Sequence, residues 1–381
     1  MITGDLGRGV HGKVKLARDT ITGQSCAIKI VDKSVRRRYR MSQYGGGMPS
    51  SREPHLDKIR REIAILKKCR HPNVVRLNEV IDDPDARKIY LILELLDGGE
   101  VRWKQPDADL PLLSQEDTRR IFRDVVLGLE YLHHQGIVHR DIKPANLLMT
   151  ADSRTVKITD FGVSHLRAPR TASLRNSSTS SLAKTVGSPA FFAPELCYTG
   201  DVHRLSSGNR SNSSSRPPVT KAIDVWALGV TLYCLVYGRC PFMAETEWEL
   251  FNVIPRKELT FPSDVVVSPL LRDLLQRLLT KDPTARITLS EVKRHPWVVA
   301  DLPDPDGWRR ATDPTRYTQV NVTDEEVKRA VTIKERIRNQ IRRLSNTLGL
   351  RKRSKPAQPS ANTVAAMFAD DTTSSSSVSG H

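Results

Sequence analysis

The pattern of apolar and polar positions changes character at Ser114. Before this residue, alternating positions and short apolar runs predict strands at 13–17, 26–31, 74–81 and 89–95, with one helix at 56–68. From Ser114, a predicted N-cap, the apolar spacing follows a period of about 3.6 residues, which predicts a long helix. Further helices are predicted at 223–238, 268–280 and 289–294. The chain therefore divides into a small sheet-rich lobe and a larger, mainly helical lobe.

Composition and charge narrow the class of protein. The 381 residues include 60 Lys and Arg against 43 Asp and Glu, a net charge of +17 that favours phosphates, acidic peptides or anionic surfaces as partners. The 5 cysteines have no metal-binding spacing, which predicts a reducing compartment without structural zinc. Neither a signal peptide nor an apolar stretch of membrane-spanning length occurs. We expect a soluble cytoplasmic protein, with the nucleus as a second candidate location.

A glycine-rich segment lies between two apolar segments near the start of the chain. Gly7, Gly9 and Gly12 are two and three residues apart, and glycines let a hairpin backbone approach phosphates and donate its N–H groups. This pattern alone also fits an ordinary turn or a Rossmann turn. A Rossmann turn needs a helix at the glycines, whereas a strand follows here and Lys29 lies one strand later. That order is typical of protein kinases.

A second motif is far more specific. The run from His139 to Asn146 places Asp141 and Lys143 on the same short loop, so that a hydroxyl-proton acceptor, a phosphate partner and a metal ligand occur together. Asp160-Phe161-Gly162 and Ala193-Pro194-Glu195 follow in the order found in kinases.

With these four motifs, residues 1–297 resemble eukaryotic protein kinases. The resemblance implies a bilobal α+β fold, in which a small lobe has an antiparallel β-sheet plus a helix and a larger lobe is mainly α-helical.

The resemblance implies a role for each motif residue, with ATP and Mg²⁺ as cofactors. Lys29 would hold the α- and β-phosphates and pair with Glu62, Asp141 would accept the proton of the substrate hydroxyl, and Lys143 would neutralise the γ-phosphate. The implied magnesium ligands are Asn146 and Asp160. The implied ATP-binding residues, besides Lys29, are Leu6, Gly7, Gly9, Gly12, Val14, Ala27, Leu93, Glu94, Leu96, Glu100 and Leu148. The complete set favours an active enzyme over a pseudokinase.

Other motif residues are expected to be structural. The resemblance implies that Glu195 pairs with Arg286 and that Asp224 holds the backbone of the catalytic loop. His133 and His134, at the end of a helix, are expected to be surface or packing residues.

Several segments resemble one kinase family in particular, the calcium/calmodulin-dependent protein kinase kinases. They are the Arg- and Pro-containing insert after Lys29 and the runs 62–68, 185–191, 226–234 and 322–327. The glycine loop and the Ser-rich inserts are similar to fungal members. Members phosphorylate activation-loop threonines of other kinases, such as AMP-activated and calmodulin-dependent kinases. Ala145 agrees with this, because many Arg-directed kinases have a glutamate at that position. The basic insert also fits a solvated loop.

The resemblance divides the chain into the following regions: a small lobe at 1–95 with a basic insert at 35–54, a large lobe at 96–299 with an activation segment at 160–195 and a Ser-rich insert at 206–218, a linker at 300–327, a basic regulatory segment at 328–353 and a disordered tail at 354–381. Because Gly7 lies six residues from Met1, we expect the first strand to be very short or missing, and an alternative start.

The basic segment 328–353 contains ten Lys or Arg and one acidic residue. Thr323 and Glu326 predict a capping box, and Gly349 predicts the end of the helix. Apolar residues gather on one face of this helix: Ala330, Ile333, Ile337, Ile341, Leu344 and Leu348. Such a helix can bind calmodulin, an anionic membrane or its own kinase lobe, and it also fits a solvated basic helix. Nucleic acid is not expected, because no aromatic residue is interleaved with the charges.

Regulation is expected at residues of the loops and of this helix. The predicted regulatory residues are Arg140, Thr185, Ser188, Ile337, Ile341, Leu344, Ser345 and Leu348. Phosphate on Thr185 would meet Arg140, and phosphate on Ser345 would weaken calmodulin binding. A chain ending near Pro314 is predicted to be constitutively active. Two function classes remain, an upstream kinase of other kinases, regulated by calmodulin or not, and a calmodulin- or membrane-binding scaffold with a kinase fold.

Overall fold

The computed structural model describes residues 1–9, 12–32, 60, 63–82, 88–105, 110–160, 189–197 and 220–331. The chain divides into two compact units, Met1–Lys334 and Glu335–His381, and every described residue belongs to the first. The predicted features outside the described residues are Glu62, Thr185, Ser188, Ile337, Ile341, Leu344, Ser345, Leu348, the inserts 35–54 and 206–218, and the tail 354–381.

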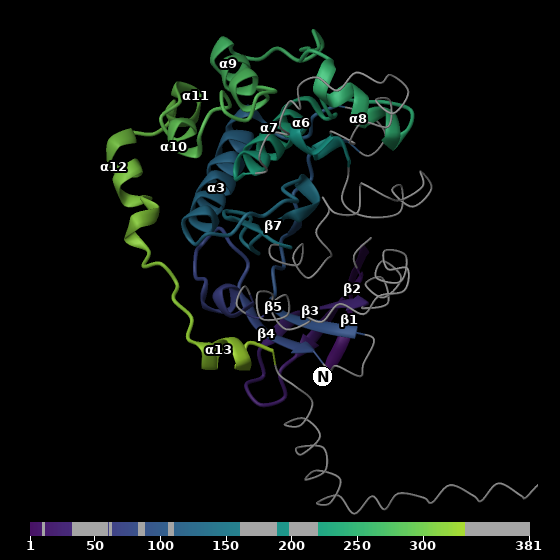
Figure 1. The fold of residues 1–381 in the computed structure, drawn as a ribbon, viewed down its shortest axis with the longest axis vertical. Coiled ribbons are helices and arrows are strands. Elements are labelled where there is room, and N and C mark those ends of the chain that lie inside the picture. The colour runs from purple at the N-terminus through teal and green to yellow at the C-terminus, as the bar shows by residue number, and fades with distance from the viewer. Residues whose placement is uncertain are drawn as a thin grey trace, which may run out of the picture. The chain divides into compact units, whose positions relative to one another are not determined.

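The first part of the chain forms a five-stranded antiparallel sheet with the order β1-β2-β3-β5-β4 (Figure 1). The strands are β1 (Ile2–Gly9), β2 (Gly12–Arg18), β3 (Ser25–Asp32), β4 (Leu77–Asp82) and β5 (Lys88–Glu94). The expectation of a missing or very short first strand is wrong. β1 has 8 residues, and it pairs with β2 from Ile2 opposite Ala17 to Gly9 opposite Gly12.

One helix packs on this sheet, and its described residues are 60 and 63–68. Ile63 and Leu66 are buried in one apolar cluster with Val80 and Leu91 of the sheet. The same cluster contains Tyr131, Leu132 and Ile137 from the other lobe, and Ala330 from near the end of the described chain. We call these the small-lobe cluster. Residues far apart in the sequence therefore complete the core of the small lobe.

The second lobe is mainly helical and is built around two long helices. α3 (Gln115–His134) begins where predicted, because the Ser114 side chain accepts a hydrogen bond from the Asp117 backbone N–H. α7 (Ala222–Tyr237) is buried almost all round, as expected of a helix with apolar residues on every side. The shorter helical elements are η1 (Pro144–Asn146), η2 (Pro189–Phe191), α6 (Pro194–Cys197), α8 (Glu247–Arg256), α9 (Pro269–Leu278), α10 (Leu289–Val292), α11 (Pro296–Val299), α12 (Pro305–Ala311), η3 (Pro314–Arg316) and α13 (Asp324–Arg329).

A small antiparallel sheet with the order β6-β7-β8 completes this lobe. Its strands are β6 (Gly99–Glu100), β7 (Leu147–Met149) and β8 (Val156–Ile158). β8 also contacts the chain just before β4, because Ile158 N–H donates to Asn73 O (2.9 Å) and Val75 N–H donates to Ile158 O (2.9 Å). Gly128 of α3 lies against the same place, where a Cβ would come within 2.5 Å of Asn73 O. Segment 73–75 is thus a fixed joint between the two lobes.

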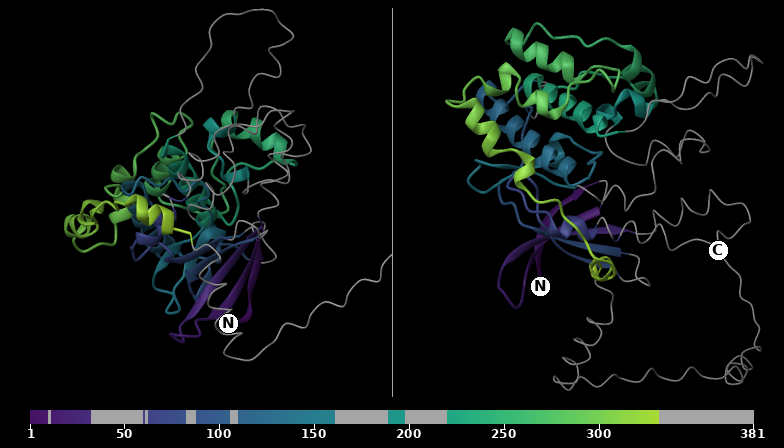
Figure 2. Two further views of the ribbon diagram at one scale, coloured as in Figure 1. Left: turned by 60° about the horizontal axis from the view of Figure 1, so that its bottom comes forward. Right: turned by 60° about the vertical axis from the view of Figure 1, so that its left-hand side comes forward.

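The residues predicted as a linker, 300–327, contain α12, η3 and most of α13. They run from the large lobe to the small lobe (Figure 2). The capping box of Thr323 and Glu326 is present. α13 itself ends at Arg329, and the side chain of its C-cap residue, Ala330, is buried in the small-lobe cluster. The part of the predicted helix from residue 332 to Gly349 lies outside the described residues. The bilobal α+β fold itself is confirmed.

Candidate active site

The loop before η1, which begins at His139, is held in place by Asp224, a buried carboxylate of α7. The backbone N–H groups of His139 and Arg140 donate to its two oxygens, at 2.7 and 2.6 Å, and His133 Nε2 lies 2.8 Å from Oδ2. Burial alone raises the pKa of this carboxyl, but the hydrogen bonds and the histidines around it lower the pKa more, so that Asp224 stays ionised. The expected structural role of Asp224 is confirmed.

His139 transmits this anchoring to the residues that carry the chemistry. Its Nδ1 accepts a hydrogen bond from Asp141 N–H (3.2 Å), which leaves Nε2–H to donate to Thr159 O (2.9 Å). Arg140 and Asp160 have φ angles of 69° and 66°, a left-handed conformation that costs non-glycine residues about 1–3 kcal/mol each. The hydrogen bonds of this network impose that geometry on the catalytic loop.

Asp141, Lys143 and Asn146 form one buried cluster. Lys143 Nζ lies 3.1 Å from Asp141 Oδ2, and the Asn146 amide nitrogen donates to the same oxygen (3.1 Å) and to the Asp141 backbone carbonyl (2.6 Å). The three side chains come from a loop and a single 3-10 turn, so their spacing is set locally. A carboxylate held by a cation and an amide is oriented as a hydrogen-bond acceptor.

Lys29 projects from β3 to meet the end of β8. Its Nζ lies 2.5 Å from Asp160 Oδ2, and their side chains are only 5% and 19% exposed. A pair this buried persists only when both charges are satisfied by each other, because each is costly to desolvate alone. Thr159 N–H donates to Asn146 O (2.9 Å), which joins Asp160 to the catalytic loop. Lys29, Asp160, Asp141 and Asn146 therefore belong to one connected site.

The predicted ATP-binding residues, apart from Leu96, which follows β5, lie on strands that pair with one another. Ala27 is opposite Leu93, Val14 is opposite Lys29, and Glu100 is opposite Leu148. Gly7 pairs with Val14 and Gly9 with Gly12 in the first hairpin. Leu6 is 48% exposed, and Leu96 is partly buried against the small-lobe cluster.

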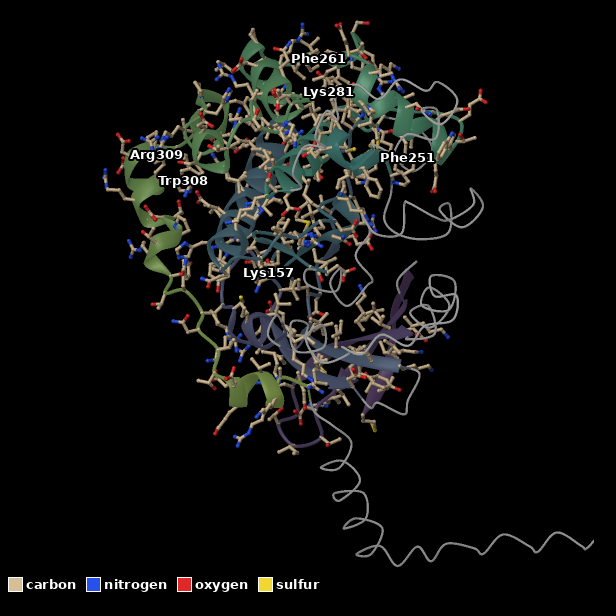
Figure 3. All side chains as sticks on the ribbon, viewed as in Figure 1. Lys157, Phe251, Phe261, Lys281, Trp308 and Arg309 are labelled. Carbon is tan, nitrogen blue, oxygen red and sulfur yellow. The ribbon has the colours of Figure 1, made fainter. Side chains whose placement is uncertain are left out.

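Glu94 is the last residue of β5, and it is held by contacts that sequence reasoning missed. Lys157 Nζ donates to both of its carboxylate oxygens, at 2.9 and 3.0 Å, and Arg76 N–H donates at 2.7 Å. Figure 3 labels Lys157, which comes from β8. The side chain of Glu94 therefore connects the small lobe to β8 of the large lobe.

The structure also tests the predicted pair of Glu195 with Arg286 and the predicted packing role of His133. Arg286 forms two hydrogen bonds with Glu195, at 2.9 and 3.0 Å, with both side chains almost fully buried, so the expected pairing is confirmed. His133 is a packing residue as expected, but its contact with Asp224 could not be read from the sequence. Sequence reasoning missed it because the two residues are 91 positions apart.

The residue types at the site fit the implied cofactors. Asn146 offers an amide oxygen and Asp160 a carboxylate, both hard ligands of the kind Mg²⁺ prefers together with substrate phosphates. Among the described residues there is no cluster of three or more His, Cys, Asp or Glu that could hold a metal alone. Mg²⁺ bound with substrate phosphates ordinarily takes only one or two carboxylates from the protein. No helix in the described ranges is long and apolar enough to cross a membrane.

The protein kinase domain family matches residues 2–298. This chain belongs to the protein kinase family. It is 54% identical over 340 residues to the serine/threonine-protein kinase ssp1 of Schizosaccharomyces pombe. The aligned residues make up 89% of this chain and 48% of that protein. It is 47% identical to SNF1-activating kinase 1 of Saccharomyces cerevisiae, over 78% of this chain and 28% of that protein. It is 40% identical to the serine/threonine-protein kinase GRIK2 of Arabidopsis thaliana, over 78% and 64%. The kinase chain thus spans half or less of its two fungal relatives named here.

Proposed function

We propose that this kinase transfers the γ-phosphate of Mg-ATP to serine or threonine residues of proteins. The observation that carries the proposal is the connected, buried site in which Lys29 meets Asp160 while Lys143 and Asn146 orient Asp141. The protein kinase family and the serine/threonine kinases among its relatives support it.

Each side chain has a role that follows from its position. Asp141 accepts a hydrogen bond from the substrate hydroxyl and orients it, and Lys143, 3.1 Å from Asp141, keeps a positive charge beside the phosphoryl group. Lys29 would hold the nucleotide phosphates, while Asn146 and Asp160 would hold the magnesium. When bound, Mg-ATP supplies the phosphoryl group and the metal offsets charge that develops on it.

The test is phosphate transfer from labelled ATP to a mixture of protein substrates by the full chain. Lys29→Met and Asp141→Asn should each lower the rate by about three orders of magnitude or more, since each removes charge control that no neighbour supplies. Lys15→Met, which removes a half-buried lysine of β2 that pairs with Asp5 of β1, is the matched control and should keep the wild-type rate. Wild-type rates in both active-site variants would refute the proposed mechanism.

We further propose that the substrates are activation-loop threonines of other kinases. The support is the resemblance to kinase kinases and the name of the relative SNF1-activating kinase 1. Ala145 also supports it, because a folded surface rather than a local Arg motif would then direct recognition.

Phosphosite mapping distinguishes a kinase that acts on other kinases from a general serine/threonine kinase. A folded kinase domain of the AMP-activated type should be phosphorylated at its activation-loop threonine much faster than the same threonine in a short peptide. Equal rates on both, or phosphate spread over surface sites, would show that the chain is a general serine/threonine kinase instead.

The third part of the proposal is that the basic segment 328–353 regulates the kinase and binds calmodulin. Its charge and apolar spacing support this part. Calcium-dependent binding should be lost when Ile337→Asp and Leu344→Asp are combined in the full chain. A chain ending at Lys334, where the first compact unit ends, should be active without calmodulin. This boundary replaces the earlier one near Pro314, because Val327 and Ala330 are buried in the structure and belong to the first unit. Unchanged activity on truncation and no calcium-dependent binding would refute the regulation.

A further inference from the structure

Residues 317–331, here called the C-terminal strap, contact both lobes. At the large lobe they follow the end of α3: His134 Nε2 lies 3.0 Å from Tyr317 O, and Val320 N–H donates to the Gln135 side-chain oxygen at 2.8 Å. His134 and Gln135 are four to five residues before His139, where the catalytic loop begins. The first residues of the strap are therefore attached to the end of α3, which leads into the active site.

An aromatic cluster marks the crossing from one lobe to the other. The ring of Tyr317 lies 5.1 Å from that of His71 and 5.0 Å from that of Tyr131, and His71 stacks on Tyr131 at 4.8 Å. Tyr131 also accepts a hydrogen bond from the Arg70 backbone N–H (2.9 Å), just after the helix that contains residues 63–68. Edge-to-face and stacked rings of this kind favour one relative orientation of the elements that carry them.

At the small lobe the strap packs against the end of helix 63–68. Lys68 Nζ donates to Asn321 O (2.9 Å) and pairs with Glu326 (2.6 Å), and Lys67 Nζ lies 3.4 Å from Ala330 O. Val327 and Ala330 are 5% and 3% exposed, and Ala330 belongs to the small-lobe cluster. Figures 1 and 2 show α13 beside the small lobe in every view. Burial of these apolar side chains, more than the exposed ion pair, supplies the attachment.

This attachment has a short route to Lys29. The small-lobe cluster joins Ala330 to helix residues Ile63 and Leu66 and to Leu91 of β5. Leu91 is the cross-strand partner of Lys29. A displacement of helix 63–68 would thus alter the packing beneath the strand that carries the active-site lysine.

We infer that the C-terminal strap is a positioning element. It holds helix 63–68 against α3, the helix that leads into the catalytic loop, and keeps Lys29 aligned with Asp160. Val327 and Tyr317 are its positioning residues. The inference rests on the proposed phosphotransfer for its activity readout, but the position of the helix can be measured separately.

The experiment compares two Asn substitutions in α13 of the full chain. Val327→Asn introduces a polar group at a buried position, and Glu325→Asn places the same residue at an exposed position of the same helix. Hydrogen exchange is followed at residues 63–68 and, as an internal reference in the large lobe, at α9. Initial rates at varied ATP concentration separate kcat from KM.

Val327→Asn should reduce amide protection at 63–68 with no change at α9, and should lower kcat/KM for ATP about tenfold, within the range of coupling energies between linked sites. Glu325→Asn should leave both readouts unchanged. Unchanged protection at 63–68 in Val327→Asn would overturn the inference, and so would equal loss of protection at α9, which would indicate general unfolding. If the wild-type chain transfers no phosphate, the proposed function fails, whereas the exchange result still decides the inference.

Discussion

The catalytic loop and helix 63–68 are held in place in different ways. The loop is held by buried polar contacts to Asp224, which is completely inaccessible to solvent. The described part of the helix is held by apolar packing and by a pair, Lys68 and Glu326, whose side chains are about 40% exposed. Removal of a buried polar partner is costly, while an exposed ion pair contributes little. The loop is therefore fixed, and the helix is the part that its surroundings can adjust.

The largest effect on stability is expected at the fixed side of this comparison. Asp224→Ala leaves His133 and two backbone N–H groups without their acceptor and should lower the free energy of unfolding by about 3–5 kcal/mol. Urea unfolding measures it. Asp264→Ala, which breaks the half-exposed pair with Arg239, is the control and should cost less than about 1 kcal/mol. Equal losses in both variants would show that burial does not distinguish the loop.

An intermediate effect is expected from acid, through the aromatic crossing of the strap. Burial, together with the cations Lys157 and Lys293, lowers the pKa of His71 to about 4 from 6.5, and its Nδ1 accepts from Asn73 N–H (3.1 Å). Because the unfolded chain binds this proton at a higher pH than the folded chain does, stability from His71 is complete above pH 6.5. It is lost as pH falls toward 4, by up to about 3 kcal/mol.

His71→Asn tests this, because asparagine can still accept from a backbone N–H two residues on but does not titrate. Unfolding free energies between pH 4 and 7 should fall more steeply with acid in the wild type than in the variant. Asp124 acts in the opposite direction: burial raises its pKa to about 6, so its contribution to folding stability is lost as pH rises. Because both the wild type and the variant contain Asp124, its contribution cancels in the comparison. Parallel pH profiles would contradict the assignment to His71.

The smallest effect is expected at the exposed end of the strap. Lys68→Glu and Glu326→Lys should each increase hydrogen exchange at 63–68 by about twofold, and the double exchange of charges should restore part of the protection, because Lys at 326 cannot accept from Thr323 N–H and Glu at 68 cannot donate to Asn321 O. The effect should shrink as salt is added, because exposed charges are screened. If the double variant is no better than the single ones, the pair does not contribute to the strap.

Much of the fold and of the site follows from local sequence. The Ser114 cap, the apolar stripe of α3 and the strands around Lys29 were all predicted, because each depends on neighbours within a few residues. The loop from Asp141 to Asn146 was predicted for the same reason. α8 was not predicted, since only Leu250 and Ile254 of its ten residues are buried and Pro255 interrupts its pattern.

What the tertiary structure alone decided concerns residues whose partners lie far along the chain. The sequence by itself determined that Thr323 caps a helix, but it placed Ala330 on the apolar face of a basic helix and gave no partner for it. The burial of Ala330 at the end of α13 depended on an apolar cluster built from helix 63–68, two strands and the end of α3, which no local pattern contains. The contacts of Asp224 with His133 and of Tyr317 with His71 also join residues that are far apart in the sequence. Periodicity and capping report local backbone preference, whereas burial is a property of the assembled core, so only the fold could turn a predicted linker into the strap.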